Sequence, residues 1–315
     1  MLVHFHCKFE QKKKMKVLIT GATGLIGQEL TQLLLQNNHT VHYLTTSPLK
    51  IQNKPNYYGF YWNPQEGKID ENCIQGVEAI VHLAGASISK RWTNSYKQEL
   101  IESRVLSANL LFSLLKKTPN QVQHFVSASG TAIYPDSTTN IYDESSQLID
   151  TSFLGQVVVK WEESADQFHL LNLKVTKLRT GVVFSNQGGA LLEMIKPIKN
   201  YVGSGFGSGK QIQSWIHLTD VVQLYYFVLQ NHIEGIINAV APQTVTNQEQ
   251  TKTIAKYLKR PIWLPNVPQF VMKAILGDMH VLLFNNKNIV PKRALELGFK
   301  FQFPTLDKAL ENLLK

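Results

Sequence analysis

Short apolar runs alternate with segments of helical periodicity over residues 16–184 of the chain. Runs with the length and composition of buried strands fall at residues 16–20, 39–46, 57–62, 77–85, 124–130 and 173–184. Segments 25–38, 96–117 and 161–172 place their apolar residues on one helix face, as amphipathic helices do. The alternation of strands and helices predicts a parallel sheet with helices on both of its faces.

The pattern loosens after residue 185, where a helix is predicted over residues 220–231 and prolines recur from residue 261 onward. We therefore expect an α/β domain over residues 15–185 and a smaller, mostly helical substrate lobe over 186–315 at the carboxyl edge of the sheet. Residues 1–14 are interpreted as a loose leader before the first strand, with an organellar presequence as the open alternative.

Alternating glycines at positions 203, 205, 207 and 209 form a distinct segment of this lobe. Ordering such a segment costs conformational entropy, so we expect it to be mobile. It is either a lid over a concave site or a plain surface loop. As a lid it would make Lys210, Gln211 and Trp215 the residues facing the substrate, which suits a polar or anionic ligand.

Composition and charge narrow the classes of function. Hydrophobic residues make up 43% of the chain and charged residues 17%, as in a folded globular protein. No apolar run approaches the ~18–20 residues of a membrane span, so no membrane partner is expected. The net charge of +9 is spread without a block of Lys and Arg, which argues against a nucleic-acid partner.

The cysteines and histidines indicate neither a disulfide framework nor a metal centre. Cys7 and Cys73 are the two cysteines, and this usage favours a reducing, cytoplasmic location. The histidines are scattered, apart from the HFHC segment in the leader, so no metal site is predicted.

The segment GATGLIG places Gly21, Gly24 and Gly27 between the first strand and the first helix. In this context glycines allow a tight turn, a close approach of backbone to a diphosphate, and packing of helix on strand. The helix N-terminus adds free N–H groups and a partial positive charge. No P-loop lysine follows, so ATP and GTP are not expected. The motif predicts a Rossmann-type doubly wound α/β fold that binds a dinucleotide.

The end of the second strand favours NADP over NAD. Readers of NAD place an acidic residue there for the ribose hydroxyls, whereas this chain reads YLTTSPLK. Thr45, Thr46 and Ser47 can bond a 2′-phosphate, and Lys50 can neutralise it. An acid would repel that phosphate, so its absence favours NADP.

Further segments make a family visible. In order they are HLAGASI (82–88), KRWT (90–93), ESR (102–104), SASG (127–130), WEESA (161–165), LRTGVVF (178–184), GSGKQIQSWIHLTD (207–220), NAVAPQTVTN (238–247) and VPKR (290–293). Together with GATGLIG they resemble an atypical branch of the extended short-chain dehydrogenase/reductases, the epimerase-like SDR39U1/YfcH-type family. The resemblance runs from about Met15 to the end, and residues 262–314 are similar to the family's C-terminal module.

This resemblance implies an NADP-type cofactor along the carboxyl edge of the sheet, with contacts to its successive parts. The diphosphate contacts are Gly21, Gly24, Leu25, Ile26 and Gly27. The remaining contacts are Thr45 and Thr46 at the adenosine phosphate, Leu83, Ala84 and Gly85 near the adenine side, Glu99 and Arg104 on the long helix, and Val183 beside the nicotinamide. Family members often carry arginine at the Thr46 position. From spacing alone, Glu99 and Arg104 could equally be a solvent-exposed pair.

The usual catalytic pair of the superfamily is missing. Ordinary members use Tyr-x-x-x-Lys on one helix face for general acid–base catalysis. None of the 11 tyrosines is followed by lysine four residues later. In FLGQVVVKWEE, residues 153–163, Leu154 takes the tyrosine position and Val158 the lysine position. Lys160 is expected to face elsewhere, because two residues along a helix turn it by ~200°.

Three explanations stay open at this stage. The acid has moved, with Tyr134, Ser129 and His217 as candidates; the chemistry needs little proton transfer from the protein; or the chain is a non-catalytic sensor or scaffold that holds NADP(H). Each candidate has a structural alternative: Tyr134 as a packed aromatic, Ser129 as a turn cap and His217 as a satisfied core histidine. We expect an oxidoreductase or epimerase-like protein acting on an unknown small substrate, and we leave a homodimer open.

Overall fold

The computed structural model describes residues 14–315, and its centre is a 9-stranded, mostly parallel sheet. The strand order is β13-β9-β7-β6-β1-β2-β4-β3, with β5 paired to β4. Only β3 and β5 run antiparallel to their neighbour among these strands. The bounds are β1 (Lys16–Thr20), β2 (Thr40–Thr45), β3 (Asn53–Lys54), β4 (Tyr57–Asn63), β5 (Lys68–Ile69), β6 (Ala79–His82), β7 (His124–Gly130), β9 (Lys174–Thr180) and β13 (Gly235–Ala239).

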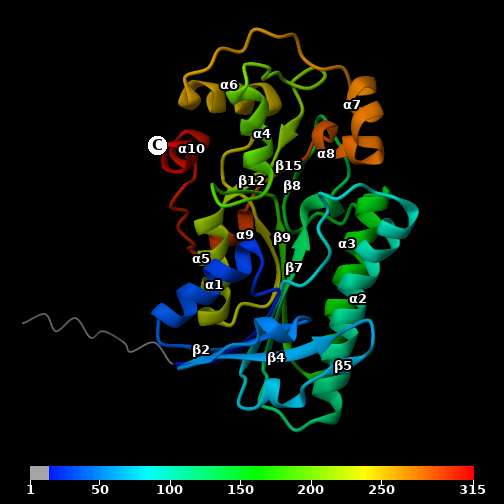
Figure 1. The fold of residues 1–315 in the computed structure, drawn as a ribbon, viewed down its shortest axis with the longest axis vertical. Coiled ribbons are helices and arrows are strands. Elements are labelled where there is room, and N and C mark those ends of the chain that lie inside the picture. Colours follow the sequence, from blue (N-terminus) through cyan, green and yellow to red (C-terminus); the bar gives the residue numbers. More distant parts are fainter. Residues whose placement is uncertain (1–13) are drawn as a thin grey trace, which may run out of the picture.

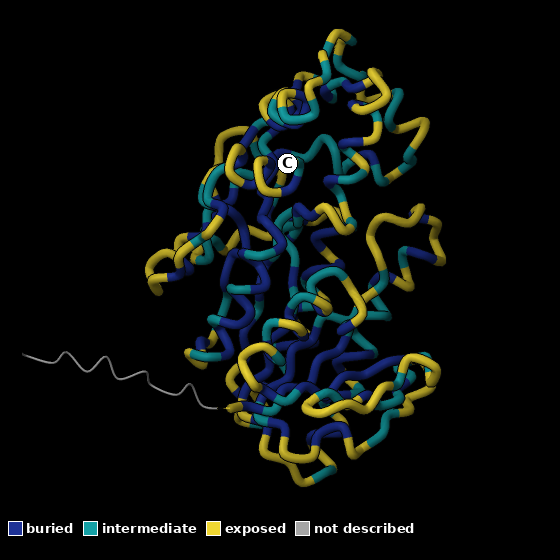
Figure 2. Tube along the Cα trace, turned by 60° about the vertical axis from the view of Figure 1, so that its left-hand side comes forward, coloured by how far each residue is buried: buried dark blue, intermediate teal, exposed yellow. Residues whose placement is uncertain are grey.

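Helices cover both faces of this sheet, as Figure 1 shows. One face carries α1 (Leu25–Gln36) and α5 (Leu218–Asn231); the other carries α2 (Asn94–Lys117) and α3 (Phe153–Asp166). An apolar core lies on each face, and Figure 2 shows the central strands as buried. Strands that are buried on both faces have near-continuous apolar sequences, and these runs allowed the central strands to be predicted from the sequence. The predicted doubly wound α/β fold is confirmed.

Two predicted elements differ from the structure. The run 173–184 contains two strands, because Gly181 N donates to Ala239 O while Val182 N donates to Ser214 O. β10 (Val182–Phe184) therefore leaves the main sheet and pairs with β12 (Trp215–His217). The helix expected from residue 161 begins at Phe153, where the Ser152 side chain accepts a hydrogen bond from Gly155 N. The run of valines in the first half of this helix hides its helical periodicity in the sequence, so the predicted start was too late.

The remaining elements build the second part of the molecule. They are β8 (Ile141–Tyr142), α4 (Ala190–Lys199), β11 (Ile212–Gln213), β14 (Val245–Thr246), α6 (Asn247–Leu258), α7 (Gln269–Leu276), α8 (Val281–Phe284), β15 (Asn288–Ile289), α9 (Lys292–Glu296) and α10 (Leu306–Leu314). Short 3-10 turns are η1 (Pro48–Lys50), η2 (Glu71–Ile74), η3 (Thr131–Ile133), η4 (Gln167–Leu171) and η5 (Gly277–His280). A third core joins α4, α6 and α10 at one end of the molecule (Figure 1).

The chain returns to the main sheet after residue 185. β13 pairs with β9 and α5 covers one sheet face, so both belong to the α/β layers although they come from the predicted lobe. The division at residue 185 stays a prediction. The expected leader, with Cys7, falls on residues 1–13, outside the described residues, except for Lys14. No helix within residues 14–315 is long and apolar enough to cross a bilayer.

The glycine-rich loop, residues 201–211, is hydrogen-bonded to its surroundings. Gly207 N donates to Val267 O at 2.9 Å, and Phe206 N donates to the Asn247 side chain at 2.8 Å. The Gln211 amide closes the loop by donating to Phe206 O. Gln211 and Trp215 are themselves buried, whereas Lys210 is exposed. These contacts favour a packed connection over the mobile segment that the glycines predicted, whether lid or surface loop.

A buried ion pair attaches the C-terminal tail to the α/β domain. Lys287 Nζ lies 2.7 Å from Asp150 Oδ2 and also donates to Tyr134 O. Both charged side chains are about nine-tenths covered, with relative exposures of 12% and 10%. Asn286 adds bonds beside them, since its backbone N donates to Asp136 and its side-chain amide to Ser137 O. The segment before β15 is thereby fixed to the start of α3.

We predict that Lys287→Met lowers the free energy of unfolding by about 3–5 kcal/mol, because it leaves the Asp150 carboxylate buried without its cation. The measurement is urea denaturation of both proteins. Lys292→Met is the matched control: its partner Asp143 is 3.3 Å away and the Lys292 side chain is 54% exposed. That control should lose less than about 1 kcal/mol. Equal losses in the two variants would contradict a buried tail clamp.

Candidate functional site

The first crossover of the sheet is shaped by two glycines. Gly21 has φ +70°, and a Cβ there would lie 2.9 Å from Leu83 C. A Cβ on Gly27 would lie 2.2 Å from Gly21 O. Any side chain at either position would collide with backbone, which cannot yield as a flexible side chain can. Backbone therefore approaches backbone closely at both glycines, which only glycine allows.

Helix α1 begins at this turn with unpaired amides. Gly24 is its N-cap and offers no side-chain cap, and the first turn contains no acidic residue. The amides of Leu25, Ile26 and Gly27 have no hydrogen-bond partner within residues 14–315. Free N–H groups and the helix dipole make such an end an anion site. The geometry fits the diphosphate of a dinucleotide at the residues that the sequence predicted.

The buried hydroxyl of Thr20 joins the end of β1 to the loop that follows β6. Thr20 Oγ1 accepts from the backbone amides of Leu83 and Ala84, both at 3.1 Å. It therefore donates to His82 Nδ1 at 2.8 Å. Burial lowers the pKa of His82 to about 4, so the ring is neutral and its Nε2–H faces Ser107 Oγ at 3.2 Å. Sequence reasoning missed Thr20 and His82, since nothing in HLAG marks the histidine as an anchor.

The predicted cofactor residues converge on this edge. Leu25, Ile26, Leu83 and Val183 all pack at the rim of the core under α1. Gly189, in the loop after β10, would place a Cβ 3.5 Å from the Leu25 side chain and 3.7 Å from Val183 O. The small β10–β12 sheet thus comes next to the anion site. Sequence position alone could not show that approach.

The end of β2 carries hydroxyls and an exposed cation. Ser47 N donates to Thr45 Oγ1 at 3.2 Å, while Thr46 and Lys50 are exposed. Tyr43 fixes the loop, because its hydroxyl donates to Lys50 O at 2.7 Å. No Asp or Glu occurs from residue 30 to residue 65. Nothing in this stretch of sequence would repel a 2′-phosphate.

Arg104 is buried without a carboxylate partner among the described residues. It is 7% exposed, and its guanidinium donates to Leu100 O at 2.7 Å and to Ala86 O at 3.2 Å. The group lies 4.6 Å from the centre of the Trp161 ring. Burial lowers the pKa of Arg104 to about 10. Glu99 is exposed and forms no ion pair with Arg104, so the two are not the solvent-exposed pair that spacing allowed.

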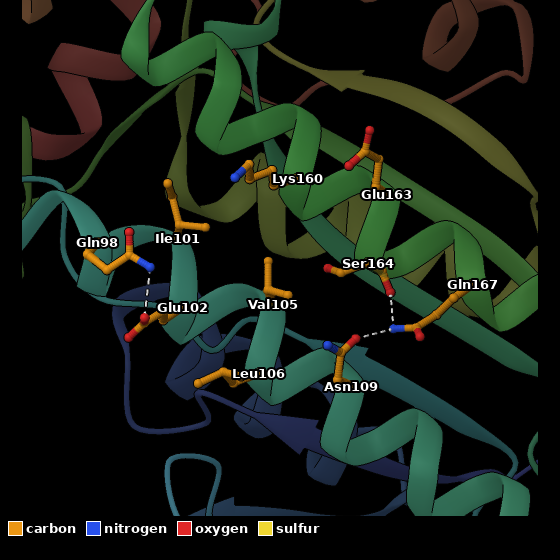
Figure 3. Close-up of a pocket in the computed structure, with 10 residues that line it drawn as sticks. All are labelled: Gln98, Ile101, Glu102, Val105, Leu106, Asn109, Lys160, Glu163, Ser164 and Gln167. Carbon is orange, nitrogen blue, oxygen red and sulfur yellow. Dashed lines mark hydrogen bonds between the residues drawn. The ribbon is translucent and has the colours of Figure 1, made fainter.

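The positions of the missing catalytic pair are apolar and covered. Leu154 and Val158 are buried on α3, and Val158 Cγ2 would lie 3.4 Å from a Cβ on Gly130. Lys160 instead lines a cavity of about 480 Å³ between α2 and α3, as Figure 3 shows, together with Glu163. That cavity lies on the outer side of the two helices. The expectation that Lys160 faces elsewhere is confirmed.

Tyr134 and Ser129 belong to one buried polar network. The Tyr134 hydroxyl donates to Asn238 Oδ1 at 2.8 Å and accepts from Arg179 Nη1 at 3.0 Å. Ser129 Oγ donates to Glu162 Oε1 at 2.6 Å, and Arg179 holds both oxygens of Glu162 at 2.8 Å. Tyr134 is 0% exposed, and burial raises its pKa. Both hydroxyls are therefore already used inside the protein.

His217 caps a helix. Its Nδ1 accepts from Thr219 N at 3.0 Å, and its Nε2 faces Asn312 Oδ1 at 3.2 Å. Phe303 stacks on the ring at 3.9 Å between centroids. Burial lowers the pKa of His217 to about 4. The geometry is that of the satisfied core histidine, with no nitrogen left for a substrate.

Metal ligation has no support within residues 14–315, where no group of three or more His, Cys, Asp or Glu side chains is arranged to hold an ion.

Comparison with known protein families identifies two segments. A profile of the NAD dependent epimerase/dehydratase family matches residues 17–240, and a domain of unknown function, DUF1731, matches residues 267–313. The second match overlaps the C-terminal module expected over 262–314.

Three relatives illustrate the similarity. The chain is 35% identical to the chloroplastic epimerase family protein SDR39U1 homolog of Arabidopsis thaliana, over 98% of this chain and 89% of that one. The structure of the human epimerase family protein SDR39U1 with NADPH matches at 32% identity and TM-score 0.83, covering 95% of this chain and 99% of that one. A nucleoside-diphosphate sugar epimerase from Corynebacterium glutamicum matches at 28% identity and TM-score 0.78, covering 96% and 59%.

We predict that Arg179→Met lowers the free energy of unfolding by about 3–5 kcal/mol at neutral pH, because the buried Glu162 would lose both hydrogen bonds to its main cation and keep only Lys177, at 3.6 Å. Burial alone raises the pKa of Glu162, but the hydrogen bonds and charge of Arg179 outweigh it and hold that pKa below its ordinary value. The pair thus stabilises the fold above the unfolded pKa of about 4.3 and stops doing so as pH falls through the folded pKa.

Denaturation measured at several pH values checks this. The deficit of Arg179→Met should shrink as pH falls from neutrality, beginning above about pH 4.3, because without Arg179 burial raises the pKa of Glu162 and the carboxyl takes up a proton above its unfolded value. Lys196→Met, which breaks an exposed pair with Glu193 at 2.6 Å, is the control and should change little. A deficit that does not vary with pH would contradict the charge-pair explanation.

Proposed function

Because the chain belongs to the NAD-dependent epimerase/dehydratase family, we propose that it is an NADP(H)-binding oxidoreductase or epimerase-like enzyme that acts on a small substrate. The observation that carries this proposal is the set of free amides at the start of α1. Leu25, Ile26 and Gly27 offer three free amides at a helix start without a side-chain cap. Such donors suit the diphosphate of a dinucleotide.

The proposed cofactor is NADP(H), with NAD(H) less favoured. The support is electrostatic: the end of β2 exposes Thr46 and Lys50, and no acidic residue lies between residues 30 and 65. The human relative was solved with NADPH. A 2′-phosphate brings negative charge that an acid would repel and that Lys50 would attract.

The proposed contacts follow the predicted edge. The amides of α1 would bind the diphosphate, with Gly21 and Gly24 in the turn, and Thr45 and Thr46 would receive the adenosine phosphate. Leu83, Ala84 and Gly85 would lie along the adenine side, with Arg104 behind Gly85, where a Cβ would be 3.2 Å from its guanidinium. Glu99 is proposed only from the resemblance, and Val183 is proposed beside the nicotinamide. The cofactor, when bound, supplies or accepts a hydride.

A second candidate function is a non-catalytic NADP(H) sensor or scaffold. One observation favours it: the superfamily's acid and lysine positions hold Leu154 and Val158. In addition, the polar atoms of Ser129, Tyr134 and His217 form hydrogen bonds within the protein. If one of these three is the relocated acid, its internal bonds must break during turnover. A homodimer stays a prediction under either function.

We predict that NADPH raises the melting temperature of the protein more than NADH does, because tighter binding to the folded state gives a larger shift. Thr46→Asp should remove most of the NADPH shift and spare the NADH shift, since the new carboxylate would repel the 2′-phosphate. Thr46→Arg should increase the NADPH shift. Thermal unfolding at several cofactor concentrations gives these values. Equal shifts with both cofactors in the wild type would overturn the preference for NADP.

The two candidate functions differ in turnover. With NADPH and a panel of carbonyl compounds and sugar nucleotides, the enzyme should lower the absorbance at 340 nm or form an epimerised product detected by chromatography. Gly27→Ala is the negative control, because it places a Cβ 2.2 Å from Gly21 O. Tight NADPH binding without turnover of any compound would favour the sensor.

A further inference from the structure

A second cavity, of about 300 Å³, lies between the starts of α2 and α3 and the tail after α7. Trp92, Phe153 and Leu154 contribute apolar wall, and Asp278, His280 and Asn285 come from the tail. Leu154 is the position at which the superfamily places its tyrosine. The cavity therefore adjoins the place where the missing acid would have acted, and the family's domain of unknown function covers it.

His280 is bonded through only one ring nitrogen, as buried His42 also is. It is 9% exposed and lines the cavity. Its Nδ1–H donates to Gly277 O at 2.8 Å, whereas Nε2 has no hydrogen-bond partner within residues 14–315. By contrast, His82 and His217 use both ring nitrogens. The carbonyl fixes the tautomer and the ring orientation, leaving Nε2 as the free acid–base atom.

Charged groups surround the ring from several elements. Asp278 follows α7 and forms an ion pair with Lys97 of α2 at 2.5 Å. Asp136 and Asp150 also line the cavity, and Asp150 is paired with Lys287 outside it. Asp136 Oδ1 already accepts from Asn286 N. Lys97 lines the cavity as well, so its charges are largely paired within the wall. Paired charges and apolar walls suit an uncharged carbonyl or hydroxyl compound better than an anion.

We propose that this cavity is the reaction site and that His280 Nε2 is its acid–base atom, in place of the missing tyrosine. The proposal rests on the proposed enzyme function. In the reducing direction the Nε2–H bond of the imidazolium breaks as an O–H bond forms on the substrate's carbonyl oxygen. The hydride that completes the reduction comes from the reduced nicotinamide dinucleotide, and water returns the proton to Nε2. The oxidising direction reverses each transfer.

A test independent of turnover uses carbethoxylation by diethyl pyrocarbonate, followed by peptide mass spectrometry. The reagent attacks an open, unprotonated imidazole nitrogen, so His280 should react despite its burial. Exposed His169 serves as the positive control, and buried His82 and His217 should not react. Modification of His169 without His280 would overturn the assignment of an open Nε2.

A second test uses the activity panel with His280→Gln, His280→Ala and the control His169→Gln. Both His280 variants should keep the NADPH melting shift and lose about 10²–10⁴-fold in kcat, the usual range for an acid–base group. Added imidazole should restore part of the His280→Ala rate, which a structural role would not allow. The control should keep the wild-type rate.

The outcomes separate this proposal from the function on which it rests. Wild-type turnover that survives His280→Gln overturns the role of His280 and leaves the enzyme function standing. NADPH binding without any wild-type turnover overturns both the enzyme function and the catalytic role of His280. Loss of the NADPH shift in wild type overturns the cofactor proposal itself.

Discussion

A single buried hydroxyl holds the cofactor edge together. Thr20 is 0% exposed, and its oxygen accepts from two backbone amides of the second crossover while it donates to His82. His82 then reaches Ser107 on α2. One chain of hydrogen bonds thus joins β1, β6 and α2 in the region where Gly21 approaches Leu83. Since buried polar atoms are costly when unpaired, this arrangement allows few alternatives, and the free amides of α1 start from a fixed turn.

The two buried arginines near the site differ in charge pairing: Arg179 has a carboxylate partner and Arg104 has none among the described residues. Arg179 is neutralised by Glu162 through two bonds of 2.8 Å, so the region of the missing proton relay is a closed, satisfied network. Arg104 has only carbonyl oxygens and the face of Trp161. The cation–π contact gives up to about 2 kcal/mol when desolvated, and it does not neutralise the charge. The uncompensated cation therefore lies beside Gly85, where an incoming anion would be stabilised.

The sequence predicted what depends on local pattern and on spacing within one segment. Six strands of the sheet, the glycine turn and the absence of Tyr-x-x-x-Lys could be predicted, because each depends on neighbouring residues; β3, β5 and β13 were not predicted. The Glu162–Arg179–Tyr134 network was not, because it joins three elements and gives no pattern along the chain. The split at Gly181 was also hidden, since a change of hydrogen-bond partner leaves an apolar run intact. The place of His280 in the cavity lined by the start of α3 depends on a tail more than a hundred residues away.

The missing tyrosine and the position of the tail are physically coupled. Leu154 packs with Trp92 and Leu100, and tail residues Met279 and Val281 lie against this cluster. A tyrosine ring at position 154 is larger than the leucine and would overpack this contact with Trp92, Met279 and Val281. The leucine lets the tail seat on α3, and the same seating brings the His280 ring to the cavity. Loss of the acid from α3 and closure by the tail are therefore parts of one arrangement.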